Sequence, residues 1–210
     1  MLKSASEEPI ERCSVLPEPR FAELGPVLAQ RLEQVATRTI TPWNFGSLLD
    51  TLMQEVFQHG LTAAGAHEGT IWLLDPEEQN LIPAYNTGLD ADRFVGTFRQ
   101  PLNQGLVCMV FASEQPFVEN DVYKNTRQSR QLDSLLQKQT HALIALPFYF
   151  LKNCRGVVSC VQLGEPERQQ PARCGFTHVH LAEMQRTVGI LSRLLEYQLL
   201  GRTVGWQTDS

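Results

Sequence analysis

The chain has no apolar run that approaches the roughly 20 residues of a membrane-spanning helix, and its N-terminus, MLKSASEEP, lacks the apolar core of a signal peptide. It also lacks a basic surplus, because 18 Lys and Arg stand against 23 Asp and Glu among 210 residues, a formal net charge of -5. A dedicated nucleic-acid binder needs excess positive charge to neutralise phosphates. We therefore expect a cytoplasmic protein whose partners are neither membranes nor nucleic acids.

The cysteines form no recognisable framework. They are odd in number and contain no CxxC pair, which excludes a disulfide scaffold and a zinc knuckle: Cys13, Cys108, Cys154, Cys160 and Cys174. We see no paired carboxylates, phosphate loop or catalytic triad motif. His178 and His180 are two residues apart in a predicted helix, so they lie on different faces and form no shared metal site. The residues specify no cofactor, and the chain is more readily a binding module than an enzyme.

The length suits one filled domain with extensions. We expect a proline-rich, flexible leader over residues 1–20, an amphipathic helix and linker over 21–40, the main domain over 41–200, and a short tail over 201–210.

Helical spacing of apolar residues predicts several helices. One covers Phe21 to Val35 despite Pro26, and a second begins at the Thr41-Pro42 cap and ends between Gly60 and Gly65. Shorter helices are predicted over 105–113 and 127–139, and a long one begins near Thr177 and reaches about Leu200.

Two hairpins are predicted from β-branched, aromatic and aliphatic runs. The first spans residues 70–86, TIWLLDPEEQNLIPAYN, whose acidic centre suits a turn. The second joins residues 142–150 to 156–163. The order of these elements indicates an α+β sandwich with an antiparallel sheet: a helix, a hairpin, a crossing segment, a second hairpin and a closing helix.

At this point the sequence resembles a GAF domain, a relative of the PAS-like sensory domains, over about residues 42–200. The resemblance rests on five segments: TIWLLDPEEQNL, PLNQGLVCMVFASEQPFVENDV, HALIALPF, GVVSCVQL and GFTHVHLAEMQRTVGILSRLLEYQLL. It implies a central six-stranded antiparallel sheet with N- and C-terminal helices on one face. A ligand cavity is implied on the other face, under a roof formed by the segments between Thr87 and Gln139.

The resemblance implies a non-catalytic sensory module for signal transduction that binds an unidentified small molecule. We expect a homodimer formed through the helices that contain Leu28, Leu32 and the stripe Leu181 to Leu195, although the same stripes could pack within one chain. Only ten residues follow Leu200. We therefore expect a GAF domain that stands alone, or nearly so, and passes its signal to a separate output protein.

Candidate pocket residues follow from the segment ENDVYKNTR and from neighbouring aromatics. Their amide, acid, phenol and guanidinium groups can hydrogen-bond a ligand, and the aromatics can line a cavity: Phe98, Phe111, Asn120, Asp121, Tyr123, Arg127 and His141. The structural alternative is that Asp121 organises a loop, Arg127 lies on the surface and the aromatics belong to the core. The Asn-Lys-Phe-Asp-Glu signature of cyclic-nucleotide-binding members and the Cys-His pair of bilin-binding members are both missing.

Two further functions remain open. Cys108 lies on the predicted central helix, as does the reactive thiol of the free methionine sulfoxide reductases, which would make the protein a thiol redox enzyme or sensor. Its position is displaced by one residue from that family's Gly-Val-Cys-Gly pattern, and a buried structural cysteine is the alternative. The other function is a dimerisation scaffold without a ligand.

Overall fold

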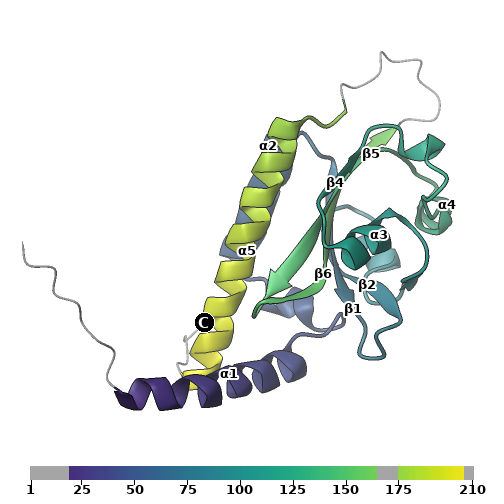
Figure 1. Cartoon of the computed structure of the whole chain (residues 1–210). Coiled ribbons are helices and arrows are strands. Elements are labelled where there is room, and N and C mark those ends of the chain that lie inside the picture. Colours follow the sequence, from purple (N-terminus) through teal and green to yellow (C-terminus); the bar gives the residue numbers. More distant parts are fainter. Residues whose placement is uncertain (1–18, 165–174, 206–210) are drawn as a thin grey trace, which may run out of the picture.

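The computed structural model describes residues 19–164 and 175–205, so the predicted leader up to residue 18 lies outside the described residues. The fold is α+β, as expected. One antiparallel sheet has α2 (Thr51–Ala63) and α5 (His178–Val204) on one face, and α3 (Leu106–Ser113) and α4 (Gln131–Leu136) on the other (Figure 1).

The sheet has six strands in the order β3-β2-β1-β6-β5-β4. The bounds are β1 Glu68–Leu74, β2 Asn80–Asn86, β3 Gln100–Pro101, β4 Phe117–Glu119, β5 Gln139–Phe150 and β6 Asn153–Gly164. Both predicted hairpins are confirmed as the pairs β1–β2 and β5–β6. The pairing of β1 with β6 joins the two hairpins into one sheet.

Alternation along the strands divides the interior into two cores. Ile71 and Ile144 face the long helices, while Trp72 and Leu143 face α3 and the roof. Both faces of the central strands are therefore covered, which explains why their sequences are almost continuous runs of apolar residues.

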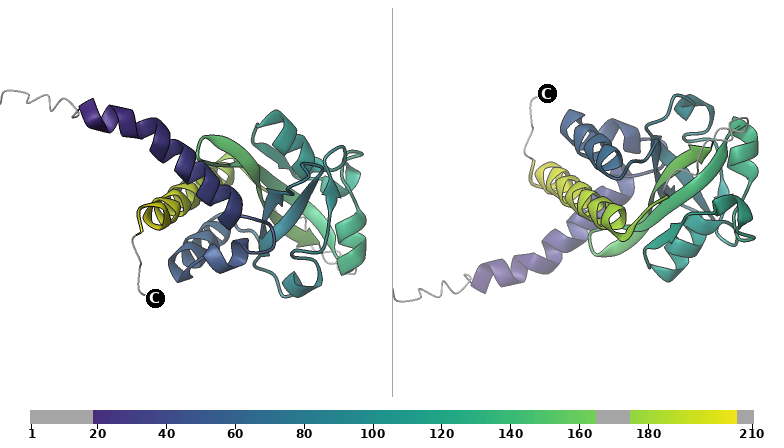
Figure 2. Two further views of the ribbon diagram at one scale, coloured as in Figure 1. Left: turned by 90° about the horizontal axis from the view of Figure 1, so that it is seen from below. Right: turned by 90° about the horizontal axis from the view of Figure 1, so that it is seen from above.

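The N-terminal helix is longer than predicted, because α1 spans Pro19–Thr39 with Pro26 inside it. Its residues 23–31 are exposed, and the helix extends away from the rest of the domain (Figure 2). Among its described side chains, those of the C-terminal half, which include Leu32, Val35 and Ala36, pack on the core.

The predicted start of the second helix at Thr41-Pro42 is wrong. Thr41 begins a turn held by the Asn44 side chain, and the short 3-10 helix η1 (Phe45–Leu48) follows. An extended Leu49 then separates η1 from α2. Asp50 is the true cap, since its side chain accepts a hydrogen bond from the Met53 amide at 2.8 Å.

The C-terminal helix begins as predicted after Thr177 but continues through Val204, into the region expected to be tail. The apolar stripe expected to meet a second chain is mostly used within the domain. Met184, Val188, Leu191 and Leu195 are buried, and Leu181 is partly buried against the same core. This stripe is therefore not a free dimer surface.

Among the described residues, no helix is long and apolar enough to cross a membrane.

Candidate functional site

An internal cavity of about 80 Å³ lies between the sheet and the roof, on the face expected to bind a ligand. Its apolar wall comes from β1, α3, α4 and β5, and includes Trp72, Leu106, Leu132 and Leu143. A water molecule takes up about 30 Å³ in the liquid, so the cavity of about 80 Å³ has room for roughly two to three water-sized groups. It is smaller than the roughly 300–1,000 Å³ that is usual for ligand pockets.

Polar side chains reach this cavity from the floor of the sheet. The Trp72 Nε1 group donates to Ser159 Oγ at 2.9 Å, and the Asn86 amide donates to Thr70 Oγ1 at 2.9 Å. In the part of the chain that the structure describes, the Ser129 hydroxyl oxygen in the roof is buried and has no hydrogen-bond partner. Buried polar atoms normally have such a partner, so the unpaired Ser129 hydroxyl is an exception among the side chains that line the cavity.

Lys138 connects the roof to the sheet beside the cavity. Its Nζ lies 2.6 Å from Glu68 Oε1 on β1 and 2.9 Å from Asp90 Oδ2 in the loop after β2. Burial alone lowers the pKa of Lys138, but its hydrogen bonds to the two carboxylates outweigh burial and raise it. Lys138 therefore stays charged and holds the roof against the sheet.

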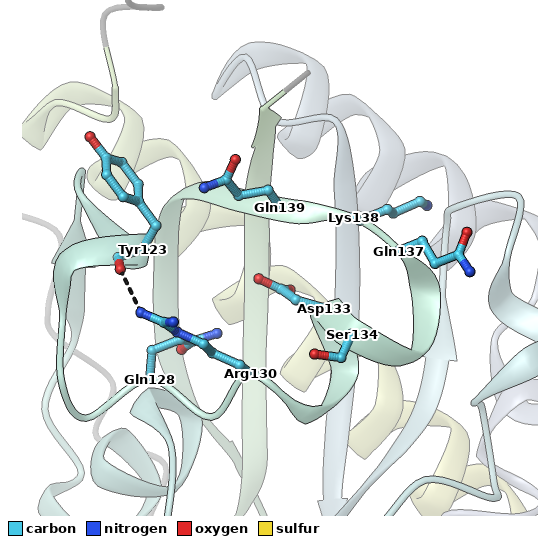
Figure 3. A pocket seen from close by; sticks show the side chains of 8 residues that line it. All are labelled: Tyr123, Gln128, Arg130, Asp133, Ser134, Gln137, Lys138 and Gln139. Carbon is cyan, nitrogen blue, oxygen red and sulfur yellow. Dashed lines mark hydrogen bonds between the residues drawn. The ribbon is translucent and has the colours of Figure 1, made fainter. Parts of the chain in front are cut away.

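An open polar basin of about 510 Å³ lies outside the roof (Figure 3). Eight residues line it: Tyr123, Gln128, Arg130, Asp133, Ser134, Gln137, Lys138 and Gln139. Three of these, Gln128, Asp133 and Lys138, also line the internal cavity. We call these three residues the neck.

The pocket residues expected from the sequence are dispersed in the structure. Tyr123 stacks on His141 with ring centroids 6.1 Å apart and also lines the basin. Phe98 packs edge-to-face on Trp72, while Phe111 belongs to α3 and packs, partly buried, against the core on that side of the sheet. None of the seven lines the internal cavity.

The polar members of that set serve other contacts. The Asn120 side chain bonds both backbone polar groups of Phe176 and so anchors the start of α5. Asp121 pairs with Lys124 at 3.1 Å on the surface. Arg127 Nη1 lies 3.5 Å from Met109 Sδ in an open groove beside α3.

Cys108 is 1% exposed and packs in the core between α3 and the sheet. Burial raises the pKa of its thiol to about 12. A thiol nucleophile needs a lowered pKa, so this environment opposes a catalytic role. In the described part of the chain, no three His, Cys, Asp or Glu side chains gather into a metal-binding group.

The cavity-lining residues that the sequence analysis missed carry a weak signal. Thr70, Thr140 and Ser159 are buried polar residues within otherwise apolar strands. Alternation places Thr70 and Ser159 on the roof side of the sheet, whereas Thr140 lines the cavity beyond the irregularity in β5 between Thr140 and Ala142. A polar residue in a buried strand position indicates a hydrogen-bonding role. Lys138 and Glu68, by contrast, are 70 residues apart, and only the folded chain brings them together.

Comparison with known families and structures agrees with this geometry. The family model of the GAF domain matches residues 47–196, and the chain therefore belongs to the GAF domain family. Members of this family act as sensory and regulatory small-molecule-binding modules.

Solved structures share the fold at low sequence identity. The GAF domain of a phosphoenolpyruvate-protein phosphotransferase from Coxiella burnetii has a TM-score of 0.58 at 17% identity, covering 86% of this chain and 97% of that chain. The second GAF domain of DevS from Mycobacterium smegmatis has a TM-score of 0.53 at 17% identity, covering 73% and 97%.

A free methionine-R-sulfoxide reductase from Neisseria meningitidis, solved with its substrate, has a TM-score of 0.51 at 16% identity, covering 89% of this chain and 95% of that chain. No curated protein sequence matches the chain. At these identities the structural likeness establishes the fold alone.

Proposed function

We propose that this protein is a non-catalytic sensory GAF module that binds a small molecule in the internal cavity beneath α3 and α4. The observation that carries the proposal is the cavity itself, where apolar walls meet hydroxyl and amide groups from several elements. The buried, unpartnered Ser129 hydroxyl supports it further, because a ligand that bonds to this atom would offset the cost of its burial.

The proposed signal passes through the sheet. A ligand would draw the roof toward β5 and β6, whose alternate residues pack on α5 on the opposite face. Ligand binding would therefore favour one arrangement of the roof and, through these strands, of the long helices. Slower backbone hydrogen exchange of residues 127–139 and of α5 on ligand addition would support this route, whereas unchanged exchange would contradict it.

We also propose a homodimer, through helix surfaces other than the stripe expected from the sequence. Ile190, Tyr197 and Val204 are exposed on α5 at intervals of seven residues, and Leu28 is exposed on α1 together with Leu24 and Val27. Regular spacing of seven suits the packing of one helix against another.

The ligand proposal is tested by native mass spectrometry of the purified protein with a cavity-filling variant. Val161→Phe adds a ring inside the cavity, and Val179→Phe makes the same change at an exposed position on α5. We expect a bound mass in the wild type and in Val179→Phe, and its loss in Val161→Phe. A bound mass that persists in Val161→Phe would place the ligand elsewhere and contradict the proposal.

A ligand-free dimerisation scaffold is the second candidate function, and the small volume of the cavity favours it. If the wild type carries no bound mass and no metabolite in a broad panel raises its melting temperature, the scaffold function replaces the sensory one.

A further inference from the structure

The polar basin and the internal cavity are adjacent parts of one site. They share the neck residues Gln128, Asp133 and Lys138, although they differ in character. The basin is open and lined by charged and amide groups, whereas the cavity is small and combines an apolar wall with hydroxyl and amide groups. A ligand that passes the neck would place a polar end in the basin and an apolar end in the cavity.

Two side chains of the basin carry charges that the fold leaves unneutralised. Arg130 donates from Nη2 to the Tyr123 carbonyl at 3.0 Å, and no carboxylate among the described residues pairs with it. Asp133 accepts hydrogen bonds from the Thr140 amide at 3.1 Å and hydroxyl at 2.8 Å, and no cation of the described residues pairs with it.

The other charges near the basin already have partners. Lys138 is held by Glu68 and Asp90, and Arg93 also pairs with Asp90 at 3.1 Å. Figure 3 shows Asp133 between Arg130 and Lys138, on the same side of the basin as Ser134. Among the described residues that line the basin, Arg130 is therefore a cation and Asp133 a carboxylate without an ionic partner, three positions apart in the chain.

This charge pattern selects against ligands that carry a single sign of charge. A ligand that carries only a negative charge would be attracted by Arg130 but repelled by Asp133. A ligand that carries only a positive charge would be attracted by Asp133 but repelled by Arg130. A molecule with an anionic and a cationic group a few bonds apart satisfies both. The planar guanidinium suits a carboxylate, which it can bind through two parallel hydrogen bonds.

The cavity limits the rest of the molecule. Its apolar wall and its room for roughly two to three water-sized groups suit a short arm of a few carbon atoms. We propose, on the basis of the sensory function above, that the ligand is a small zwitterion with its carboxylate at Arg130, its ammonium at Asp133 and a short apolar arm in the internal cavity.

The first test uses isothermal titration calorimetry on the full chain with the common α-amino acids as probes. L-Leucine is the reference probe, since its side chain has four carbon atoms. We expect leucine to bind and both of its singly charged analogues, leucinamide and N-acetyl-leucine, to bind at least about tenfold more weakly, because each lacks one of the two charges.

The second test assigns the carboxylate to its partner. Arg130→Gln should weaken leucine binding at least about tenfold and leave leucinamide binding within about twofold, because leucinamide has no carboxylate to lose. Arg127→Gln is the matched control: it removes another exposed arginine three residues away, outside the basin and the cavity. It should leave both affinities unchanged.

Three outcomes overturn the proposal, and they separate it from the sensory function. Equal binding of leucine and its two analogues would contradict the zwitterion. Equal losses in Arg130→Gln and Arg127→Gln would contradict the assigned contact. If no amino acid binds but Val161→Phe removes a co-purified mass, the zwitterion is wrong and the sensory function stands; if neither is seen, both are wrong.

Discussion

Asp75, in the turn between β1 and β2, is a buried acid whose surroundings favour its charge. Its carboxylate accepts hydrogen bonds from the Gln79 amide and from the amide and side chain of Asn80, at 2.7 to 3.0 Å, and Arg99 lies 3.7 Å away. Burial alone raises the pKa of Asp75, but these hydrogen bonds and the nearby guanidinium outweigh burial, so the pKa is lowered.

Because its folded-state pKa lies below the unfolded value of about 3.9, Asp75 stabilises the fold above roughly pH 4 and loses this effect as the pH falls through the folded pKa. We expect Asp75→Asn to lower the free energy of unfolding at pH 7 by about 1–3 kcal/mol. Urea unfolding at several pH values should show the difference from wild type shrinking below about pH 4. Asp92→Asn, at an exposed position, is the control and should change little; a pH-independent deficit in Asp75→Asn would contradict this account.

Cys108 and Cys160 should be unreactive in the folded protein. Burial raises the pKa of each thiol to about 12, so both remain protonated thiols at pH 8. Labelling with N-ethylmaleimide, followed by peptide mass spectrometry, should modify both cysteines in denaturant and neither in buffer. Rapid labelling of Cys108 in the native protein would contradict this prediction and would support the hypothesis of a thiol redox enzyme.

At the scale of the elements, the approach of α2 to α5 depends on a residue without a side chain. A Cβ on Gly60 would overlap the side chain of Thr187 on α5. Helix propensity alone favours alanine over glycine, so the packing and the propensity make opposite predictions here.

We expect Gly60→Ala to lower the free energy of unfolding by about 1–3 kcal/mol, because the two helices must separate to accommodate the methyl group. Gly189→Ala is the matched control, since nothing lies within 4 Å of its added Cβ. It should raise stability by about 0.5–1 kcal/mol through the propensity alone. Chemical denaturation measures both, and a stabilised Gly60→Ala would show that the helices pack less closely than described.

The elements differ in how well their own sequence specifies them. The hairpins and α5 were predicted well, because long apolar runs mark the strands and a long helical pattern marks α5. The start of α2 was predicted wrongly because Thr41-Pro42 and Asp50-Thr51 both suit a cap, and the local pattern does not rank them. Packing of Phe45 and Leu48 in the core resolves the choice in favour of Asp50.

At the scale of the whole molecule, the two long helices leave apolar residues uncovered. We expect a dimer that buries the exposed positions Tyr197 on α5 and Leu28 on α1, since apolar surface of this kind is stabilised when it leaves water. Tyr197→Glu combined with Leu28→Glu should convert the protein to a monomer in light scattering and leave its melting temperature within a few degrees. The control Leu89→Glu changes a fully exposed loop residue and should keep the dimer.

A monomeric wild type would contradict the proposed dimer directly. A dimer that survives the double substitution would place the interface on another surface of the chain.

The sequence by itself determined the α+β class, the two hairpins and the long closing helix, because these follow from local periodicity and from the order of the segments. It indicated the family through the resemblance of five segments to GAF domains. Only the tertiary structure decided which side chains surround the cavity. Glu68 and Lys138 form a hydrogen bond although they are 70 residues apart in the sequence. The neck residues Gln128, Asp133 and Lys138 come together because the roof folds over the sheet. The apolar stripe on α5 was also decided by the tertiary structure. Its spacing suits packing against a partner chain and packing against its own sheet equally well, and in the folded domain it packs against the sheet.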